Sequence, residues 1–274
     1  MRFTDYAKNG ILNHYFGYPS GSAWTNQNVS KMTAALFSAD PTSSGSFSAE
    51  ITGLGREDIS FGSVSNHVIT NNQSITFSTS GWSTPNTVAT HLAIIDDDTA
   101  GNNMISYAPL TNSIIVDSSK DIKIDIDALA VGFDTNSLTA TVATDYAFPD
   151  AIVDEILGFV YKLSTIPSQP TGWNLSLHNQ ESLTGNSHEW SGSGYSRQSV
   201  SWNAVSAGSG SFREVTSNGQ ITLPNQTDTP AAMWGIWDQS NSKLLAIHDT
   251  DPDKTVNTSD TVSFADQSIK ISID

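Results

Sequence analysis

The chain repeats its own sequence pattern, and this repeat restricts its possible folds more than any other feature does. Six short segments of the first half recur in the same order in the second half, such as residues 53–61 with 194–202 and residues 122–126 with 269–273. The offset between partners changes only from 140 residues, between Thr4 and Thr144, to 147 residues, between Ile122 and Ile269. Such ordered self-similarity indicates a tandem duplication.

The duplication predicts two domains of ordinary size in a chain of 274 residues. The first is expected over residues 1–133 and the second over residues 144–274, with a linker at residues 134–143. The alternative is one continuous sandwich whose strands are similar by coincidence, because single all-β domains also reach this length.

The composition excludes several classes of protein. The sequence has 28 Asp and Glu against 12 Lys and Arg, a formal net charge of −16, and no cysteine. A nucleic-acid partner is not expected, because binding to phosphates requires a basic surface. Disulfides and thiolate zinc sites are ruled out. The N-terminal residues do not resemble a signal peptide, and no apolar run reaches the ~18 residues of a membrane span, so we expect a soluble protein with no membrane partner.

Each copy has the pattern of a short helix followed by short strands. In the first copy, Thr4 or Asp5 can cap a helix that ends at Gly17, and in the second copy a helix is expected from Asp150 to Gly158. Only 15% of the residues are charged, and the abundant hydroxyl and amide side chains suit strands joined by tight turns. The predicted fold class is mainly β, with two tandem antiparallel β-sandwich (jelly-roll-like) domains, each preceded by a short α-helix.

Alternation of apolar and polar residues places six strands in each copy. In the first copy they are expected at residues 32–37, 56–61, 74–77, 88–95, 104–107 and 122–126. In the second copy they are expected at residues 173–177, 198–202, 220–223, 232–237, 244–247 and 268–273.

A glycine and an arginine recur at matching positions of the two copies. Gly53 and Arg56 of the first copy correspond to Gly194 and Arg197 of the second. A phosphate-binding loop requires a helix behind its glycines, whereas a strand is expected here, so we interpret the glycines as turns or bulges. Each arginine is expected to neutralise a nearby carboxylate or to bind backbone carbonyls, a structural role. Contact with a partner is the alternative.

The two helices offer a further set of candidate contact residues. One hypothesis makes the helices docking elements for a partner, and the favoured alternative makes them a cover over an open end of their own sandwich. The side chains concerned are Tyr6, Ile11, Tyr15, Ile152 and Ile156.

Two acidic clusters have some features of a calcium-binding loop. Asp249, Asp251 and Asp253 alternate ahead of Asp260, but a lysine stands where an EF-hand loop needs glycine. Residues 96–101 have the glycine but lack two of the ligands. Both clusters are therefore interpreted as solvated hairpin turns, with calcium binding left open. The six histidines lack the paired short spacing of zinc ligands, so no metal ligand and no cofactor is assigned.

No catalytic residue is assigned. In residues 190–194, Ser193 lies between two glycines, but the segment does not lie between a strand and a helix as the nucleophile of a hydrolase would. No carboxylate has the apolar setting that raises the pKa of an acid in glycoside hydrolysis. The sequence therefore predicts a protein that is not an enzyme.

Tryptophan side chains are the remaining candidates for binding, because exposed rows of them can bind sugars. Trp202 and Trp234 stand where the first copy has Phe61 and Leu92, which indicates an apolar interior. Core packing is therefore favoured over carbohydrate binding. The candidates are Trp24, in a loop, and Trp82, Trp190, Trp202, Trp234 and Trp237, in or beside expected strands.

Three motifs carry a resemblance to a known family. They are the helical segment at residues 6–14, the segment at residues 36–45 that contains Asp-Pro, and the Gly-Tyr-Ser-Arg motif that begins at Gly194. Together they resemble small virion accessory proteins of tailed bacteriophages, a group that includes capsid decoration or cement proteins and proteins labelled as tail fibres. The first copy departs from the pattern with Leu54-Gly55 in place of the tyrosine, and the second has Asn179-Gln180 in place of Asp-Pro.

The resemblance implies a non-enzymatic structural protein on the outer surface of the virion. Capsid decoration is favoured, with the phage major capsid protein or copies of the chain itself as partners. A tail or tail-fibre component that binds host-surface glycans is the first alternative. A hydrolase that acts on surface polysaccharide is the second.

Overall fold

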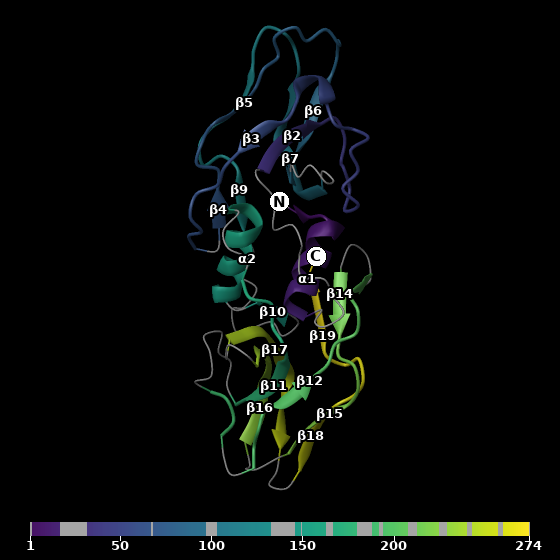
Figure 1. Ribbon diagram of the computed structural model, residues 1–274, viewed down its shortest axis with the longest axis vertical. Coiled ribbons are helices and arrows are strands. Elements are labelled where there is room, and N and C mark those ends of the chain that lie inside the picture. The colour runs from purple at the N-terminus through teal and green to yellow at the C-terminus, as the bar shows by residue number, and fades with distance from the viewer. Residues whose placement is uncertain are drawn as a thin grey trace.

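The two repeats form two β-sheet halves joined by a pair of helices (Figure 1). The computed structural model describes residues 2–16, 32–66, 68–96, 103–132, 146–148, 150–162, 167–179, 188–191, 194–207, 213–224, 229–239, 243–256 and 260–273. Within this part the chain is mainly β, as predicted, and its sheets are antiparallel. The expected linker at residues 134–143 and the side chain of Trp24 lie outside the described residues.

The first half is built on a five-stranded antiparallel sheet in the order β1-β7-β6-β2-β3, with two small pairs, β4–β9 and β5–β8, beside it. Its elements are β1 (Arg2–Phe3), α1 (Asp5–Phe16), β2 (Met32–Phe37), the 3-10 helix η2 (Thr52–Leu54), β3 (Glu57–Ile59), β4 (Val68–Thr70), β5 (Ile75–Phe77), β6 (Val88–Asp96), β7 (Asn103–Ile115), β8 (Ile122–Ile124) and β9 (Ala130–Gly132).

The second half repeats this arrangement. Its large sheet has the order β10-β17-β16-β11-β12, and its smaller sheets are β13-β14-β19 and β15–β18. Its elements are β10 (Tyr146–Ala147), α2 (Asp150–Lys162), β11 (Trp173–His178), β12 (Gln198–Val200), β13 (Ser206–Ala207), β14 (Arg213–Thr216), β15 (Ile221–Pro224), β16 (Thr229–Asp238), β17 (Lys243–Val256), β18 (Thr261–Phe264) and β19 (Lys270–Ile273). The equal strand order shows the tandem duplication in the fold itself.

One apolar core runs through both halves. The main cluster of buried side chains includes Leu36 and Ile94 of the first large sheet and Leu175 and Ile236 of the second. Alternate residues of the same strands, such as Ala35, point to the opposite face and form smaller clusters there. Because successive residues of a strand face opposite sides, both faces of each large sheet are buried.

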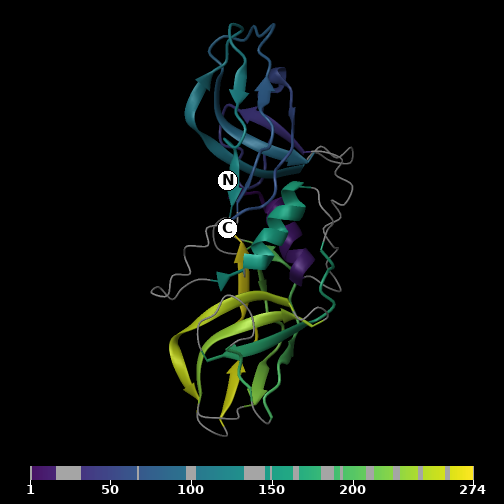
Figure 2. The same cartoon turned by 90° about the vertical axis from the view of Figure 1, so that its left-hand side faces the viewer.

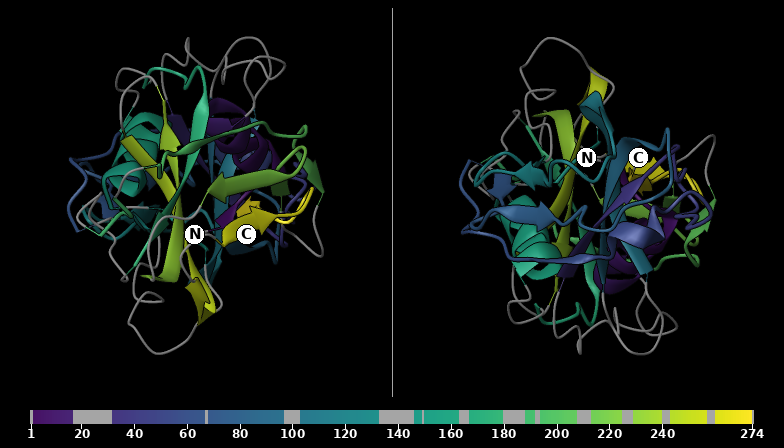
Figure 3. Two further views of the ribbon diagram at one scale, coloured as in Figure 1. Left: turned by 90° about the horizontal axis from the view of Figure 1, so that it is seen from below. Right: turned by 90° about the horizontal axis from the view of Figure 1, so that it is seen from above.

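The two helices lie side by side between the halves, where they form what we call the waist (Figures 1 and 2). Helix α1 contacts β14 and β19 of the second half as well as β7 of its own half, and α2 contacts β4 of the first half. Both ends of the chain lie near the waist (Figures 1 and 2), and in the views along the long axis they lie close together (Figure 3). Each helix therefore packs on the half to which it does not belong in sequence.

Aromatic side chains fill the waist. Phe16 packs edge-on against Trp202 with ring centroids 5.3 Å apart, and Tyr161 packs edge-on against Phe61 at 5.2 Å. The helices also touch each other, since the Phe159 ring lies 6.4 Å from the Tyr15 ring. Such tilted and edge-on pairs add to the stabilisation that burial alone supplies.

Polar contacts cross the waist as well. The Tyr15 hydroxyl donates a hydrogen bond of 2.9 Å to Glu155, and the Arg213 guanidinium pairs with Asp5 at 2.7 Å. The Trp173 indole donates a 2.7 Å bond to the backbone carbonyl of Tyr15. That carbonyl is one of the last four of α1, which have no partner within the helix, so the second half satisfies it.

The helix boundaries partly match those expected. Thr4 caps α1 as predicted, since its hydroxyl accepts a 3.4 Å bond from the Ala7 amide. The expected end of the second helix at Gly158 is wrong, because α2 continues to Lys162. Glycine inside a helix costs only about 1 kcal/mol relative to alanine, and burial of Phe159 and Tyr161 in the continued turn offsets that cost. Neither described helix is long and apolar enough to cross a bilayer.

The waist makes a direct prediction about stability. Phe16 is fully buried, so Phe16→Ala should lower the free energy of unfolding by about 3–5 kcal/mol through lost burial and the cavity that remains. Chemical denaturation followed by tryptophan fluorescence measures the change. Ile115→Ala is the control, since Ile115 is 68% exposed and its loss should shift stability by no more than about 0.5 kcal/mol. Equal losses for the two variants would contradict this account of the waist.

Candidate functional site

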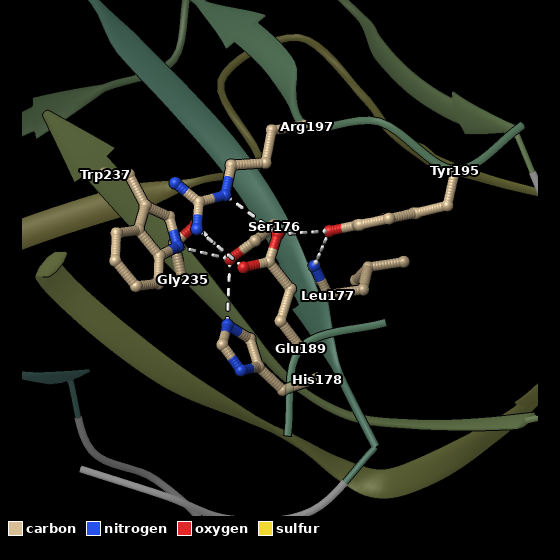
Figure 4. Close-up of polar contacts among 8 residues, drawn as sticks. All are labelled: Ser176, Leu177, His178, Glu189, Tyr195, Arg197, Gly235 and Trp237. Carbon is tan, nitrogen blue, oxygen red and sulfur yellow. Dashed lines mark hydrogen bonds and ion pairs between the residues drawn. The ribbon is translucent and has the colours of Figure 1, made fainter. Parts of the chain in front are cut away.

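The outer face of the second large sheet holds a group of buried polar side chains, which we call the Ser176–His178 cluster (Figure 4). Leu175 and Leu177 of β11 face the main core, so Ser176 and His178 face the other side of the sheet. Both polar residues are fully buried. The Ser176 hydroxyl lies 2.8 Å from Nε2 of His178 and accepts a 2.7 Å bond from the Trp237 indole.

A glycine makes room for this cluster. Gly235 of β16 lies directly opposite Ser176 in the sheet register. A Cβ atom at Gly235 would lie 2.8 Å from Leu244, 3.0 Å from the Ser176 hydroxyl and 3.1 Å from Nε2 of His178. Any larger residue would therefore displace the serine and histidine side chains from these positions.

An ion pair covers the cluster. Arg197 binds Glu189 through two parallel bonds, 2.8 Å from Nε and 2.6 Å from an Nη atom, and its guanidinium lies 3.7 Å from the centre of the Trp237 ring. Tyr195 donates a 3.2 Å bond to Glu189 and accepts a 3.0 Å bond from the Leu177 amide. The tyrosine thus supplies an acceptor where β12 no longer pairs with β11.

The cluster shifts the ionisation of its histidine. Burial lowers the pKa of His178 to about 4; the charge of Glu189 opposes the shift, and Arg197 and His188 add to it. Its Nδ1 atom has no hydrogen-bond partner among the described residues. His178 is therefore neutral at neutral pH, because the charged form would lose its hydration without gaining a sufficient partner.

The same ion pair occurs in the first half over an apolar face. Arg56 binds Glu50 through two bonds of 2.8 Å, with its guanidinium 5.0 Å from the Phe47 ring. The positions of Ser176, His178, Gly235 and Trp237 are taken there by apolar residues, which pack together in one cluster. These residues are Ala35, Phe37, Ala93 and Ile95. The ion pair is thus common to both halves, and the polar cluster is a feature of the second.

Each of the two recurring arginines pairs with a carboxylate of its own half, which is the contact expected of a structural role. The two recurring glycines lie in different local structures, since Gly194 lies in a turn and Gly53 in a 3-10 helix. Gly53 lies in the short helix η2, where a Cβ atom would come 2.6 Å from the Trp82 ring, and Gly194 has a φ of 105°. Sequence reasoning missed Glu50 and Glu189, although they too recur, at an offset of 139 residues and a few residues before the arginines.

The helix residues proposed as docking contacts lie mostly inside the chain. Ile11, Tyr15, Ile152 and Ile156 are buried at the waist, where they are covered by this chain itself, and Tyr6 is exposed. The preferred alternative, a cover over the helix's own sandwich, is incomplete because each helix also packs on the other half. The physical reason is that the aromatic end of each helix meets its packing partner there.

One of the two acidic clusters has different surroundings from those expected. Asp249, Asp251 and Asp253 lie within strand β17, so the interpretation of this segment as a hairpin turn is wrong. Asp96 ends β6 opposite Asn103 of β7, and the other residues of this cluster lie outside the described part of the chain. Among the described residues, no group of three or more His, Asp or Glu side chains is arranged to hold a metal ion.

The tryptophans expected in the interior are found there. Trp190, Trp234 and Trp237 are buried, and Trp82 and Trp202 are partly buried against the main core. None of these five forms an exposed row on the described surface.

A family model described as podophage GP4 fiber I protein gp80 matches the chain twice, over residues 2–132 and over residues 144–272. The first range spans β1 to β9, and the second spans β10 to most of β19, so each match covers one half of the fold. A comparison with curated proteins gave no match.

The two ion pairs predict unequal effects of the same substitution. Arg197→Lys should lower the free energy of unfolding by about 2 kcal/mol, because lysine can make neither the paired bonds nor the stack on Trp237. Arg56→Lys should cost less, since the Phe47 ring is more distant. Urea unfolding of both variants tests the order, and a larger loss for Arg56→Lys would refute the role given to the stack.

His178 predicts a loss of stability in acid. Its pKa is about 4 in the folded chain and about 6.5 when unfolded, so the unfolded chain takes up the proton first. The free energy of unfolding is therefore unaffected by this histidine above pH ~6.5. It falls by up to about 3 kcal/mol as the pH drops to ~4. His178→Phe, which copies Phe37 of the first half, should flatten this part of the stability profile. Denaturation at a series of pH values measures it, and identical slopes for both proteins would rule out the effect.

Proposed function

Because the chain belongs to the family of the podophage GP4 fiber I protein gp80 in both of its halves, we propose that it is a fibre component exposed on the outside of a podophage virion. Its standing as a structural, virion-associated protein follows from the family. The family match is the observation that carries the proposal, since the description of that family names a fibre.

The shape of the chain suits this role. Two β lobes extend in opposite directions from the waist (Figure 2), and one apolar core passes through all three parts. A continuous core resists bending, because close-packed interiors have low compressibility. A stiff, elongated unit of this kind can hold two virion components at a fixed distance from each other.

Capsid decoration, favoured by the resemblance, remains the second candidate. The two halves present a sheet of the same strand order at opposite ends of the molecule (Figure 1). A protein with two equivalent surfaces can bind two neighbouring capsid sites, and the linkage raises the effective concentration for the second contact. The partners in this case would be the phage major capsid protein and copies of the chain itself.

We propose that the chain is not an enzyme. Ser176 and His178 are in the contact that nucleophilic catalysis uses, but both side chains are buried and the serine also accepts a bond from Trp237. The nearby carboxylate, Glu189, is held by Arg197. The cluster therefore acts as internal packing. Release of sugar from host polysaccharide by the purified chain would contradict this proposal.

The placement on the particle can be tested by labelling. Gold-conjugated antibodies against the chain, applied to intact virions, should bind at fibres or at the tail in electron micrographs. Particles that lack the gene product, grown with the same host, provide the control for antibody specificity. Gold distributed evenly over the capsid would overturn the fibre proposal and support decoration, whereas labelling only of broken particles would contradict an outside position.

A further inference from the structure

The contacts between each helix and the opposite half are reciprocal. Helix α1 packs on β14, and α2 packs on β4. These two strands occupy equivalent places, since β14 pairs with β19 and β4 pairs with β9, the last strand of each half. Each helix thus packs on the equivalent strand of the other half, as it would between two copies of one unit.

The aromatic contacts repeat the same relation. Phe16 stands eleven residues after Asp5, the first residue of α1, and Tyr161 stands eleven residues after Asp150, the first residue of α2. Phe16 meets Trp202 and Tyr161 meets Phe61. Those ring partners are also equivalent, because each forms an isolated bridge to the residue that follows the strand packed on a helix. Phe61 bridges Asn71, which follows β4, and Trp202 bridges Ser217, which follows β14.

We propose that the helix-facing end of each half is an interaction surface whose partner is a second copy of the same unit. The chain is accordingly a fused pair, in which the reciprocal helices, and not the linker, hold the halves together. Separation would expose Ile11, Tyr15, Ile152 and Ile156, which are all buried at the waist. Burial of such a set is what a stable interface between subunits requires.

The two surfaces are similar but not identical. Arg213 at the start of β14 binds Asp5 of α1 with side chains about one quarter exposed. Strand β4 has the uncharged sequence Val-Ile-Thr, and the position that corresponds to Arg213 lies just before it, outside the described residues. The Asp5 carboxylate gains a cation on the second half, and this contact favours pairing of a first half with a second half.

A cut in the linker tests the proposal on the full chain. A protease recognition sequence is placed within residues 134–143, the folded protein is cleaved, and the product is studied by size-exclusion chromatography and native mass spectrometry. The two pieces should stay in one particle at micromolar concentration and should lose their circular dichroism together when denaturant separates them. Pieces that separate as folded monomers, each with its own circular dichroism unchanged, would overturn the proposal.

Substitutions in the cut protein identify the surface. Trp202→Ala should raise the dissociation constant of the two pieces by roughly 100-fold, as expected for a central aromatic residue of an interface. Ile115→Ala, at an exposed site away from the waist, should leave it unchanged. An unchanged constant for Trp202→Ala would refute the assignment of the surface.

Hydrogen exchange of the uncut, unsubstituted chain provides a measurement that does not depend on the folding of any variant. If the halves depend on each other, the slowest amides of β2 and β6 in the first half and of β11 and β16 in the second should exchange at one common rate. Two groups of rates that differ by roughly 100-fold or more, divided between the halves, would show independent folding and overturn the proposal.

Discussion

The packing of each helix on the opposite half is the interaction on which the rest of the structure depends. Each large sheet has both faces buried, but the end next to the waist is closed only when Phe16 reaches Trp202 and Tyr161 reaches Phe61. The fraction of surface that a chain buries rises with the size of the folded unit. A shared core therefore stabilises two halves that have many short strands and few charges better than two separate cores would.

This arrangement also shows which parts of the fold the sequence could predict. Strands that pair without a register shift, such as β2 and β11, were predicted almost to the residue. By contrast, β7 and β17 run far beyond the predicted ends at residues 107 and 247. Strands β7 and β17 each have a bulge in their pairing at the same place. In β7 it lies opposite residues 89–91 of β6, and in β17 it lies opposite residues 231–233 of β16. A bulge shifts the alternation by which a strand is recognised, so the recognisable pattern ends there in each copy.

The candidate site likewise has a part that the sequence could predict and a part that it could not. The arginines were identifiable because they recur at equal positions, and their role follows from the scarcity of cations in the chain. The Ser176–His178 cluster was not identifiable, because it requires Gly235 opposite Ser176 on a neighbouring strand. Sheet register joins residues that are far apart in the sequence, and a reading along the chain gives no signal for such a pair.

A comparison of the two halves separates what the fold requires from what it permits. At the waist the equivalent residues stay large and aromatic, with Phe16 matched by Tyr161 and Phe61 by Trp202. On the outer face, a buried apolar group has become a buried hydrogen-bonded group, with His178 in the place of Phe37. Such a change is tolerated only where a polar group finds partners, as Ser176 does in Trp237 and His178. The waist is therefore the constrained part of the chain, and the outer faces are the part in which duplication allowed the two copies to differ.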